Sequence, residues 1–206
     1  NMHNFISETV HNNYVYGAWC VKPEDLKDAI GGMRALGISG INVTAPHKVE
    51  VMKYIDVITD GAKKLGSVNT VVNRDGKLYG YNTDADGFCM ALTKAGIEIE
   101  NSRILIIGAG GVVRPTLIRL IDNKPKSITV VNRTKSKAKT LAEDILKSTG
   151  FEVNTEIDKL EFDIVINTTS AGMEPQENVM PIENIEEIND LSFINENTAA
   201  VDMIYN

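Results

Sequence analysis

The chain has 206 residues, of which 43% are hydrophobic and 24% are charged, and its formal net charge is −7. These values suit a globular protein of one or two domains that can bury a sizeable core. The acidic balance argues against nucleic acids and anionic membranes as partners. The longest apolar run, ILIIGAGGVV, is too short and too rich in glycine to span a bilayer. We therefore expect neither a nucleic-acid partner nor a membrane partner.

The two cysteines, Cys20 and Cys89, lie far apart in the sequence, and neither belongs to a CxxC motif or a Cys/His cluster. We expect buried thiols in a reducing cytoplasm rather than a disulfide, and no metal site. The chain starts at Asn1 and stops at Asn206, directly after an apolar segment. We therefore expect a truncated chain.

Strand and helix signals alternate in the first half of the chain. Apolar, β-branched runs predict strands, and apolar residues at helical spacing predict helices. In chain order we expect a strand over 14–21, a helix over 23–37, a strand over 37–44, a helix over 47–56 and a helix over 84–96.

A β-hairpin is predicted over residues 67–82. Two β-rich runs flank Asp75-Gly76, a pair that favours the left-handed conformations of a two-residue hairpin turn. The helix over 84–96 would follow this hairpin and end at Gly96.

The second half of the chain has a stricter order. After a polar link, IEIENSR, solid apolar runs alternate with helical segments. We expect a strand and glycine turn over 103–111, a helix over 112–122, a strand over 127–133, a helix over 134–150, and strands over 151–155, 162–169 and 198–206. Such strands imply a parallel sheet that is covered on both faces.

The predicted fold class is therefore α/β with two domains. An N-terminal α/β substrate domain would occupy residues 1–85, and a linking helix and linker would occupy 86–100. A dinucleotide-binding domain with a Rossmann-type parallel sheet would occupy 101–206.

The glycine turn is the first candidate ligand site. Gly108, Gly110 and Gly111 lie between a buried strand and a helix, with Ala109 among them. Glycines there permit a tight turn and a close approach of the backbone to a pyrophosphate, which the helix N-terminus also attracts. The third position of the GxGxxG pattern is Val113, which should push helix and strand slightly apart. A glycine-rich turn without a ligand is the alternative, and the order strand, turn, helix weighs against it.

The end of the next strand indicates which dinucleotide binds. In NAD sites a carboxylate about 20 residues onward binds the ribose 2′-OH. Here Asn132, Arg133 and Thr134 follow the strand, with Lys137 one turn later. Two cations and a hydroxyl suit a 2′-phosphate, so we expect NADP. The alternative is that Thr134 caps the helix and Arg133 is a solvated charge.

Polar residues also crowd the exits of the first-domain strands. In NVTAPHK, Lys48 falls in the first turn of a predicted helix, where the macrodipole disfavours a cation. Asp84, in YNTDADGF, falls where an N-cap belongs. Asn69 stands between β-branched residues at the start of a strand. Taken singly, these residues could be a surface lysine, a helix cap and a turn amide.

Together the motifs resemble the shikimate dehydrogenase family over essentially the whole chain. In order they are NVTAPHK, GSVNTVV, YNTDADGF, GAGG, NRT and INTTSAGM. The resemblance implies an NADP-dependent oxidoreductase of the cytoplasm that reversibly reduces 3-dehydroshikimate to shikimate, in the pathway to chorismate and the aromatic amino acids.

The resemblance also implies site residues. Lys48 and Asp84 would be the catalytic pair, with Lys48 as the general acid/base; Thr44 and Asn69 would bind ring hydroxyls, and Tyr205 would border the substrate cleft. The pyrophosphate would be bound by Gly108, Ala109, Gly110 and Gly111. The 2′-phosphate would be bound by Asn132, Arg133, Thr134 and Lys137. The nicotinamide-side loop would contain Thr168, Thr169, Ser170, Gly172 and Met173.

Some features of the family are missing from this sequence. In the family, a Ser-x-Ser segment that binds the substrate carboxylate precedes the region matching Met2-His3-Asn4. A Gln-bearing segment follows the region matching Tyr205-Asn206. This sequence contains neither segment. We therefore expect a first domain without its first strand, a shortened second domain and, if this is the whole polypeptide, weak shikimate binding. A relative that also oxidises quinate with NAD or NADP, and a catalytically silent binding module, stay open as alternatives. Whether the protein is a monomer or a homodimer stays open too.

Overall fold

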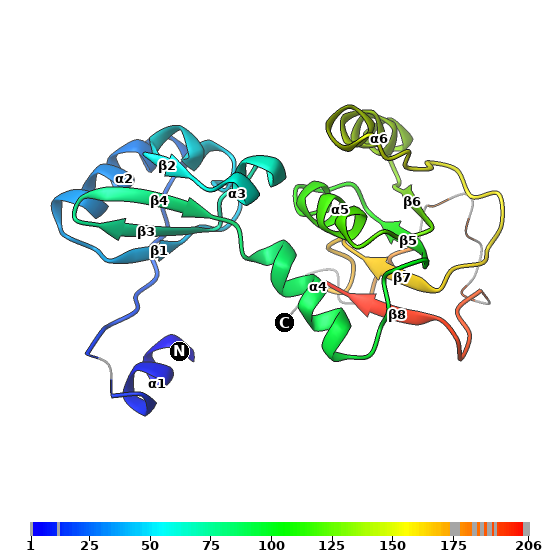
Figure 1. Ribbon diagram of the computed structural model, residues 1–206, viewed down its shortest axis with the longest axis horizontal. Coiled ribbons are helices and arrows are strands. Elements are labelled where there is room, and N and C mark those ends of the chain that lie inside the picture. Colours follow the sequence, from blue (N-terminus) through cyan, green and yellow to red (C-terminus); the bar gives the residue numbers. More distant parts are fainter. Residues whose placement is uncertain are drawn as a thin grey trace.

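The structure, a computed structural model, describes residues 2–11, 13–173, 178–182, 185, 188, 191 and 193–203. Each half of the chain builds a four-stranded sheet, and the two sheets lie in separate lobes (Figure 1). We call residues 13–81 the first lobe and residues 84–203 the second lobe. None of the helices in the described chain is long and apolar enough to cross a membrane.

The first lobe contains a mixed sheet with the strand order β1-β3-β4-β2. β1 pairs antiparallel with β3, β3 pairs antiparallel with β4, and β2 runs parallel to β4. The strands are β1 (Gly40–Asn42), β2 (Val57–Ile58), β3 (Thr70–Arg74) and β4 (Lys77–Tyr81). The helices are η1 (Pro23–Asp25), α2 (Leu26–Ala35), η2 (Glu50–Tyr54) and α3 (Asp60–Leu65).

The hairpin prediction is confirmed. β3 and β4 pair in register from Thr70 with Tyr81 to Arg74 with Lys77. Asp75 and Gly76 both have positive φ, 53° and 83°, as a two-residue turn of this hand requires. The Asn73 side chain accepts a hydrogen bond of 2.8 Å from the Gly76 N–H and closes the turn.

The strand expected over 14–21 is absent, so that prediction is wrong. This segment has no regular secondary structure, and Val15 is 90% exposed. Asn4, from helix α1 (Met2–Thr9), binds both backbone groups of Tyr16. Its Oδ1 accepts from the Tyr16 N–H at 2.6 Å, and its Nδ2 donates to the Tyr16 carbonyl at 3.1 Å. A strand forms only against another backbone, which local sequence does not reveal. Cys20 lies in this segment and is exposed, contrary to the expected burial.

The helix expected over 47–56 is also wrong in type and length. The structure has the short 3₁₀-helix η2, which buries Val51. The Arg34 guanidinium donates to the Tyr54 carbonyl at 3.0 Å and to the Asp56 carboxylate at 2.6 Å. These bonds turn the chain into β2 at Val57, which leaves no room for a longer helix.

The second lobe contains an all-parallel sheet, as predicted, and its strand order is β6-β5-β7-β8. The strands are β5 (Arg103–Ile107), β6 (Ser127–Val131), β7 (Ile164–Asn167) and β8 (Ala199–Asp202). The helices are α4 (Asp84–Lys94), α5 (Val113–Asp122) and α6 (Lys135–Thr149). The strand expected over 151–155 is reduced to one bridge between Asn154 and Thr129, so that prediction is wrong.

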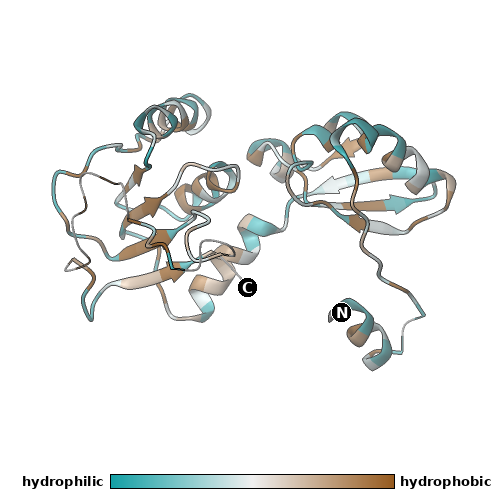
Figure 2. Ribbon diagram, turned by 180° about the vertical axis from the view of Figure 1, so that it is seen from behind, coloured by the Kyte–Doolittle hydropathy of each residue, from teal (hydrophilic) through white to brown (hydrophobic). Residues whose placement is uncertain are grey.

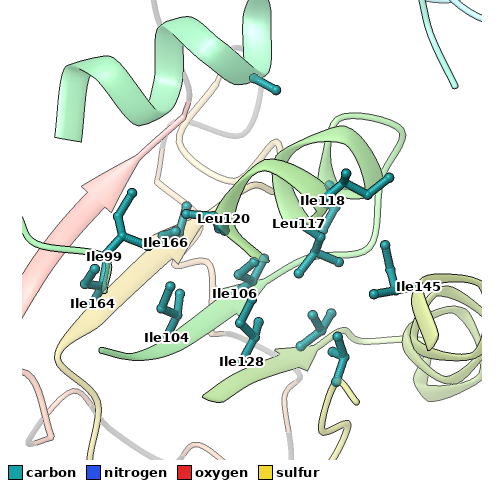
Figure 3. Packing of buried hydrophobic residues seen from close by; sticks show 14 of the residues in the cluster. Ile99, Ile104, Ile106, Leu117, Ile118, Leu120, Ile128, Ile145, Ile164 and Ile166 are labelled. Atoms are coloured by element: carbon teal, nitrogen blue, oxygen red, sulfur yellow. The ribbon is translucent and has the colours of Figure 1, made fainter. Parts of the chain in front are cut away.

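Both faces of this sheet are buried. On one face Ile104, Ile106, Ile128, Ile164 and Ile166 pack against the helices (Figure 3). On the other face Leu105, Ile107, Val131 and Val165 pack against residues such as Phe162 and Phe193. Apolar colour runs along the strands while polar colour marks much of the helices (Figure 2). This arrangement explains why the strands are solid apolar runs in the sequence.

The two lobes meet along α5, which packs against α3 and α4. Leu65 of α3 and the α4 residues Ala85, Cys89 and Leu92 belong to the hydrophobic cluster of the second lobe. α4 follows the first-lobe hairpin almost directly, so it joins the two lobes while packing with the second one.

Candidate active site

Two segments of the first lobe lie side by side at its edge. The Val43 N–H donates to the Asn69 carbonyl at 2.7 Å, and the Val68 N–H donates to the Lys48 carbonyl at 2.8 Å. The loop after β1 and the residues before β3 therefore run together. This pairing brings Asn69 beside the loop that carries Thr44 and Lys48.

Lys48 and Asp84 form an ion pair. The Lys48 Nζ lies 2.7 Å from the Asp84 Oδ2, and the two side chains are 27% and 52% exposed. A cation and a carboxylate in contact, both reachable from solvent, can exchange a proton with a bound hydroxyl or carbonyl. Lys48 lies in a turn ahead of η2 rather than in a first helical turn, so the helix-dipole argument for it is wrong.

The N-cap prediction for Asp84 is wrong as well, and the reason is informative. Thr83 occupies the N-cap position of α4, and Asp84 is the first helical residue. Asn82 does the capping instead: its Oδ1 accepts from the Asp84 N–H at 3.2 Å and from the Ala85 N–H at 3.5 Å. The Asp84 carboxylate is thereby left to contact Lys48.

Asn82 is a site residue that the sequence analysis missed. It is buried, and its amide donates to Ser67 Oγ at 2.8 Å and to the Ser67 carbonyl at 3.2 Å. The start of α4 is thus tied to the residues before β3. The local signal was an asparagine just ahead of the helix, a residue type that caps as well as aspartate does.

Asn69 holds the Asp84 carboxylate. Its Nδ2 donates to Asp84 Oδ1 at 2.6 Å and to Thr83 Oγ1 at 3.0 Å, and its Oδ1 accepts from the Thr83 N–H at 2.9 Å. The side chain is buried at 6% exposure. Asp84 therefore receives one bond from Lys48 and one from Asn69, which fixes the carboxylate from two sides.

Two further candidates of the substrate site have different outcomes. Thr44 is exposed on the loop that carries Lys48, and its carbonyl accepts from the His47 N–H at 2.9 Å. The His47 ring nitrogen Nε2 lies 2.9 Å from the Val21 carbonyl, which anchors this loop. Tyr205 lies outside the described residues.

In the second lobe the glycine turn lies where the order of the strands reverses. β5 neighbours β6 on one side and β7 on the other, so the ends of β5 and β7 flank a topological switch point, where open α/β sheets bind ligands. Gly108 has a φ of 117°, a conformation that favours glycine. Apart from the adjoining backbone, no atom of the described residues lies within 4 Å of where a Cβ would stand at Gly110 or Gly111. The exposed turn therefore leaves space for a phosphate group, next to the half-buried Ala109 and the start of α5.

The expected 2′-phosphate residues follow β6 in the predicted order. Arg133, Thr134 and Lys137 are exposed, and Asn132 donates to the Thr134 carbonyl at 3.0 Å. Thr134 is the N-cap residue of α6, but its side chain makes no capping hydrogen bond. A pocket of about 360 Å³ opens beside them, lined by Ala109, Ser136, Lys137, Thr140, Leu141 and Asp144.

The loop after β7 lies against the glycine turn. A Cβ at Gly108 would collide with the Thr168 side chain. Thr168 Oγ1 donates to the Ile107 carbonyl at 2.8 Å, and Thr169 Oγ1 donates to Asn167 Oδ1 at 2.8 Å. Further along the loop, the Met173 N–H donates to the Ser170 carbonyl at 3.1 Å, and Gly172 has a positive φ of 91°. The structure thus brings the predicted pyrophosphate and nicotinamide-side segments together.

Cys89 is a buried thiol in the hydrophobic cluster of the second lobe. Burial raises the pKa of Cys89 to about 11, so this thiol stays protonated in the core. The described residues contain no group of His, Cys, Asp or Glu side chains arranged to hold a metal ion.

Comparisons with known proteins identify the family of this chain. The family described as "Shikimate dehydrogenase substrate binding domain" matches residues 1–71, and "Shikimate / quinate 5-dehydrogenase" matches residues 90–203. A Geobacillus protein named shikimate dehydrogenase (NADP(+)) is 44% identical over 210 residues, covering 100% of this chain and 73% of the relative. This chain belongs to the shikimate dehydrogenase family.

Solved structures of the family have the same fold. A shikimate dehydrogenase crystallised with NADP⁺ superimposes with a TM-score of 0.85 and 39% identity, covering 99% of this chain and 71% of that one. The Listeria monocytogenes enzyme, solved with shikimate and NAD, gives a TM-score of 0.86 and 31% identity, covering 99% of this chain and 73% of that one. The predicted α/β fold class, with a Rossmann-type second part, is confirmed.

Proposed function

We propose that this chain catalyses the reversible, NADP-dependent reduction of 3-dehydroshikimate to shikimate, with Lys48 and Asp84 as its catalytic pair. The observation that carries the proposal is the contact of 2.7 Å between the Lys48 ammonium and a carboxylate that Asn69 also holds. Relatives that match the whole chain carry the name shikimate dehydrogenase (NADP(+)).

The residues of the second lobe suit a dinucleotide with a 2′-phosphate. Gly108 makes the tight turn against Thr168, and Gly110 and Gly111 leave the backbone open at the start of α5, where N–H groups and the helix dipole attract a pyrophosphate. Arg133 and Lys137 would bind the 2′-phosphate, and Arg133 can do so with two parallel hydrogen bonds. Bound NADPH would supply a hydride to the carbonyl carbon of the substrate.

The protein's part in the reaction is to move one proton and to orient the substrate. In the direction of reduction, the Lys48 Nζ donates a proton to the carbonyl oxygen as that oxygen becomes a hydroxyl. In the direction of oxidation, the neutral amine takes the proton back. The Asp84 carboxylate keeps the Lys48 Nζ in place and accepts a hydrogen bond from the same hydroxyl.

Specificity would come from hydrogen bonds to the ring hydroxyls. Thr44 is exposed beside Lys48 and is available to one hydroxyl. Asn69 already uses its amide on Asp84 and Thr83, so a contact with substrate requires it to exchange one of these bonds. A site that pairs each hydroxyl rejects analogues lacking one, because a buried polar group is then left unpaired.

The test is the absorbance of reduced cofactor, measured with shikimate or quinate as the reductant and NADP⁺ or NAD⁺ as the oxidant. We expect the highest kcat/KM for shikimate with NADP⁺. Oxidation of quinate at an equal kcat/KM would change the substrate assignment, and equal use of NAD⁺ would refute the 2′-phosphate assignment. Cofactor binding without turnover of either substrate would identify a binding module instead.

A further inference from the structure

Arg114 is the side chain that joins three helices at the meeting of the lobes. It lies in the first turn of α5, directly after the glycine turn. Its Nε donates to Asp144 Oδ2 of α6 at 2.6 Å, and its Nη1 donates to the Leu65 carbonyl at the end of α3 at 2.8 Å. One guanidinium therefore contacts both the first lobe and α6.

The fit between Arg114 and the end of α3 is close. Gly66 caps α3 with a φ of 70°, and a Cβ there would stand 2.9 Å from Arg114 Nη1. The Leu65 side chain is 6% exposed and packs in the hydrophobic cluster of the second lobe. A cation at carbonyls that end a helix is favourable because it opposes the helix dipole. The end of α3 is thus held by packing and by charge together.

The residues that follow Gly66 are hydrogen-bonded to the catalytic pair and to the cap of α4. Ser67 accepts a bond from Asn82, the residue that caps α4. The Val68 N–H donates to the Lys48 carbonyl at 2.8 Å, and the next residue, Asn69, holds the Asp84 carboxylate at 2.6 Å. A displacement of Leu65 and Gly66 would therefore reach Lys48 and Asp84 through a few hydrogen-bonded residues.

The Nε of the guanidinium contacts α6, which helps to line the pocket beside the predicted cofactor residues. Asp144, the partner of Arg114 Nε, lines the same pocket as Ala109 and Lys137. Arg114 thus joins the wall of this pocket to the segment that positions the catalytic pair.

We propose that Arg114 is a positioning residue for hydride transfer: it holds the end of α3, and through it Lys48 and Asp84, in register with the cofactor cradle at the start of α5. This inference rests on the proposed function and deepens it. The reacting groups are carried by different lobes, so their alignment depends on contacts between the lobes. A misplacement of about 1 Å costs on the order of 10²-fold in rate.

The experiment compares Arg114→Met and Arg114→Lys with a matched control, Lys64→Met. Lys64 also crosses between the lobes, through an ion pair of 2.6 Å with Asp122, and Arg114 bonds only its backbone carbonyl, at 3.5 Å, so Lys64→Met leaves the hydrogen bonds of Arg114 in place. For each folded variant we measure kcat per NADP⁺-binding site, the KM for shikimate, the dissociation constant of NADP⁺, and the isotope effect on kcat with shikimate deuterated at the reacting carbon.

We expect Arg114→Met to lower kcat by roughly 10- to 100-fold and to raise the isotope effect, while the KM for shikimate changes by less than about threefold, because alignment rather than binding is lost. Arg114→Lys, which keeps the charge and can donate one bond, should recover part of the loss. Lys64→Met should leave kcat within about twofold, since exposed ion pairs contribute little. An unchanged kcat and isotope effect in folded Arg114→Met, or an equal loss in Lys64→Met, overturns the proposal.

Hydrogen exchange provides a readout that does not depend on activity. The Val68 amide, which is bonded to Lys48, should exchange faster in Arg114→Met than in wild type and at the wild-type rate in Lys64→Met. If the wild type oxidises no shikimate, the proposed function fails, and an unchanged Val68 exchange rate in Arg114→Met then overturns the positioning role by itself. If Arg114→Met does not fold, Arg114→Lys takes its place with the same criteria.

Discussion

The two lobes present their ligand groups in different ways. The sheet of the first lobe has strands as short as the three residues of β1 and the two of β2, and its candidate site consists of hydrogen-bonded side chains. The sheet of the second lobe has strands of four or five residues, and β5, β6 and β7 are buried almost throughout. Its cradle depends on the backbone of a glycine turn.

Under the proposed function, this difference divides proton transfer from cofactor binding. Proton transfer needs a particular functional group at a particular atom, so the first lobe depends on the identity of single side chains. Phosphate binding at a helix N-terminus needs the backbone in a particular shape, so the second lobe depends on a rigid sheet that holds the turn. Substitutions in the two lobes should therefore fail in different ways.

Lys48→Met should produce the largest effect. Without the ammonium no group at this position donates the proton, so kcat should fall by roughly 10²- to 10⁴-fold. The dissociation constant of NADP⁺, measured by fluorescence titration, should stay near the wild-type value because the second lobe is untouched. Turnover that survives the substitution would remove Lys48 as the acid/base.

Ile106→Ala should show the opposite pattern. Ile106 is fully buried at the centre of the parallel sheet, and the cavity left behind should cost about 2–5 kcal/mol of unfolding free energy. Urea denaturation measures this loss, with Ile106→Val as the milder control. The kcat per folded molecule should barely change, and a loss of kcat as large as that in Lys48→Met would contradict the division between the lobes.

Arg133→Ala tests the side-chain part of the cofactor site. Removing a charge-assisted hydrogen bond to the 2′-phosphate should raise the KM for NADP⁺ by about tenfold or more. The KM for NAD⁺, which has no such phosphate, should stay unchanged. Steady-state kinetics with both cofactors measures the ratio, and equal effects on the two would rule out Arg133 as the phosphate ligand.

Asp163→Asn should have the smallest effect, and one that depends on pH. Hydrogen bonds from the Arg103 side chain lower the pKa of Asp163 below its ordinary value of 3.8. A lowered pKa in the folded state adds stability above the unfolded pKa and loses it as the pH falls through the folded pKa. The free energy of unfolding of the wild type should thus exceed that of Asp163→Asn by less than about 1 kcal/mol near neutral pH, because the ion pair with Arg103 is partly exposed. Urea midpoints measured down the acid range should converge below a pH of about 4.

Local chemistry decided the parts of the fold that sequence predicted well. Asp75-Gly76 fixed the hairpin because few residue pairs adopt two positive φ angles in succession. The parallel strands were recognisable because both of their faces are buried. Lys48, Asn69 and Asp84 were each ambiguous alone, and the order of the motifs made them a candidate site.

The wrong predictions concern long-range contacts. Whether residues 14–21 form a strand depends on a partner backbone elsewhere, and the length of η2 depends on Arg34. Asn82 displaced Asp84 as the cap because Lys48 and Asn69 compete for the carboxylate. The domain limits at 85 and 100, and the roles of the individual site residues, stay predictions.

Only Asn82 and Thr83 separate β4 from α4, and Asp84 is the first residue beyond them. The carboxylate therefore stands at the point where one lobe passes into the other along the chain. Were the lobes to rotate about this junction, Asp84 would move less than the loops at their far ends, and its contact with Lys48 would be kept.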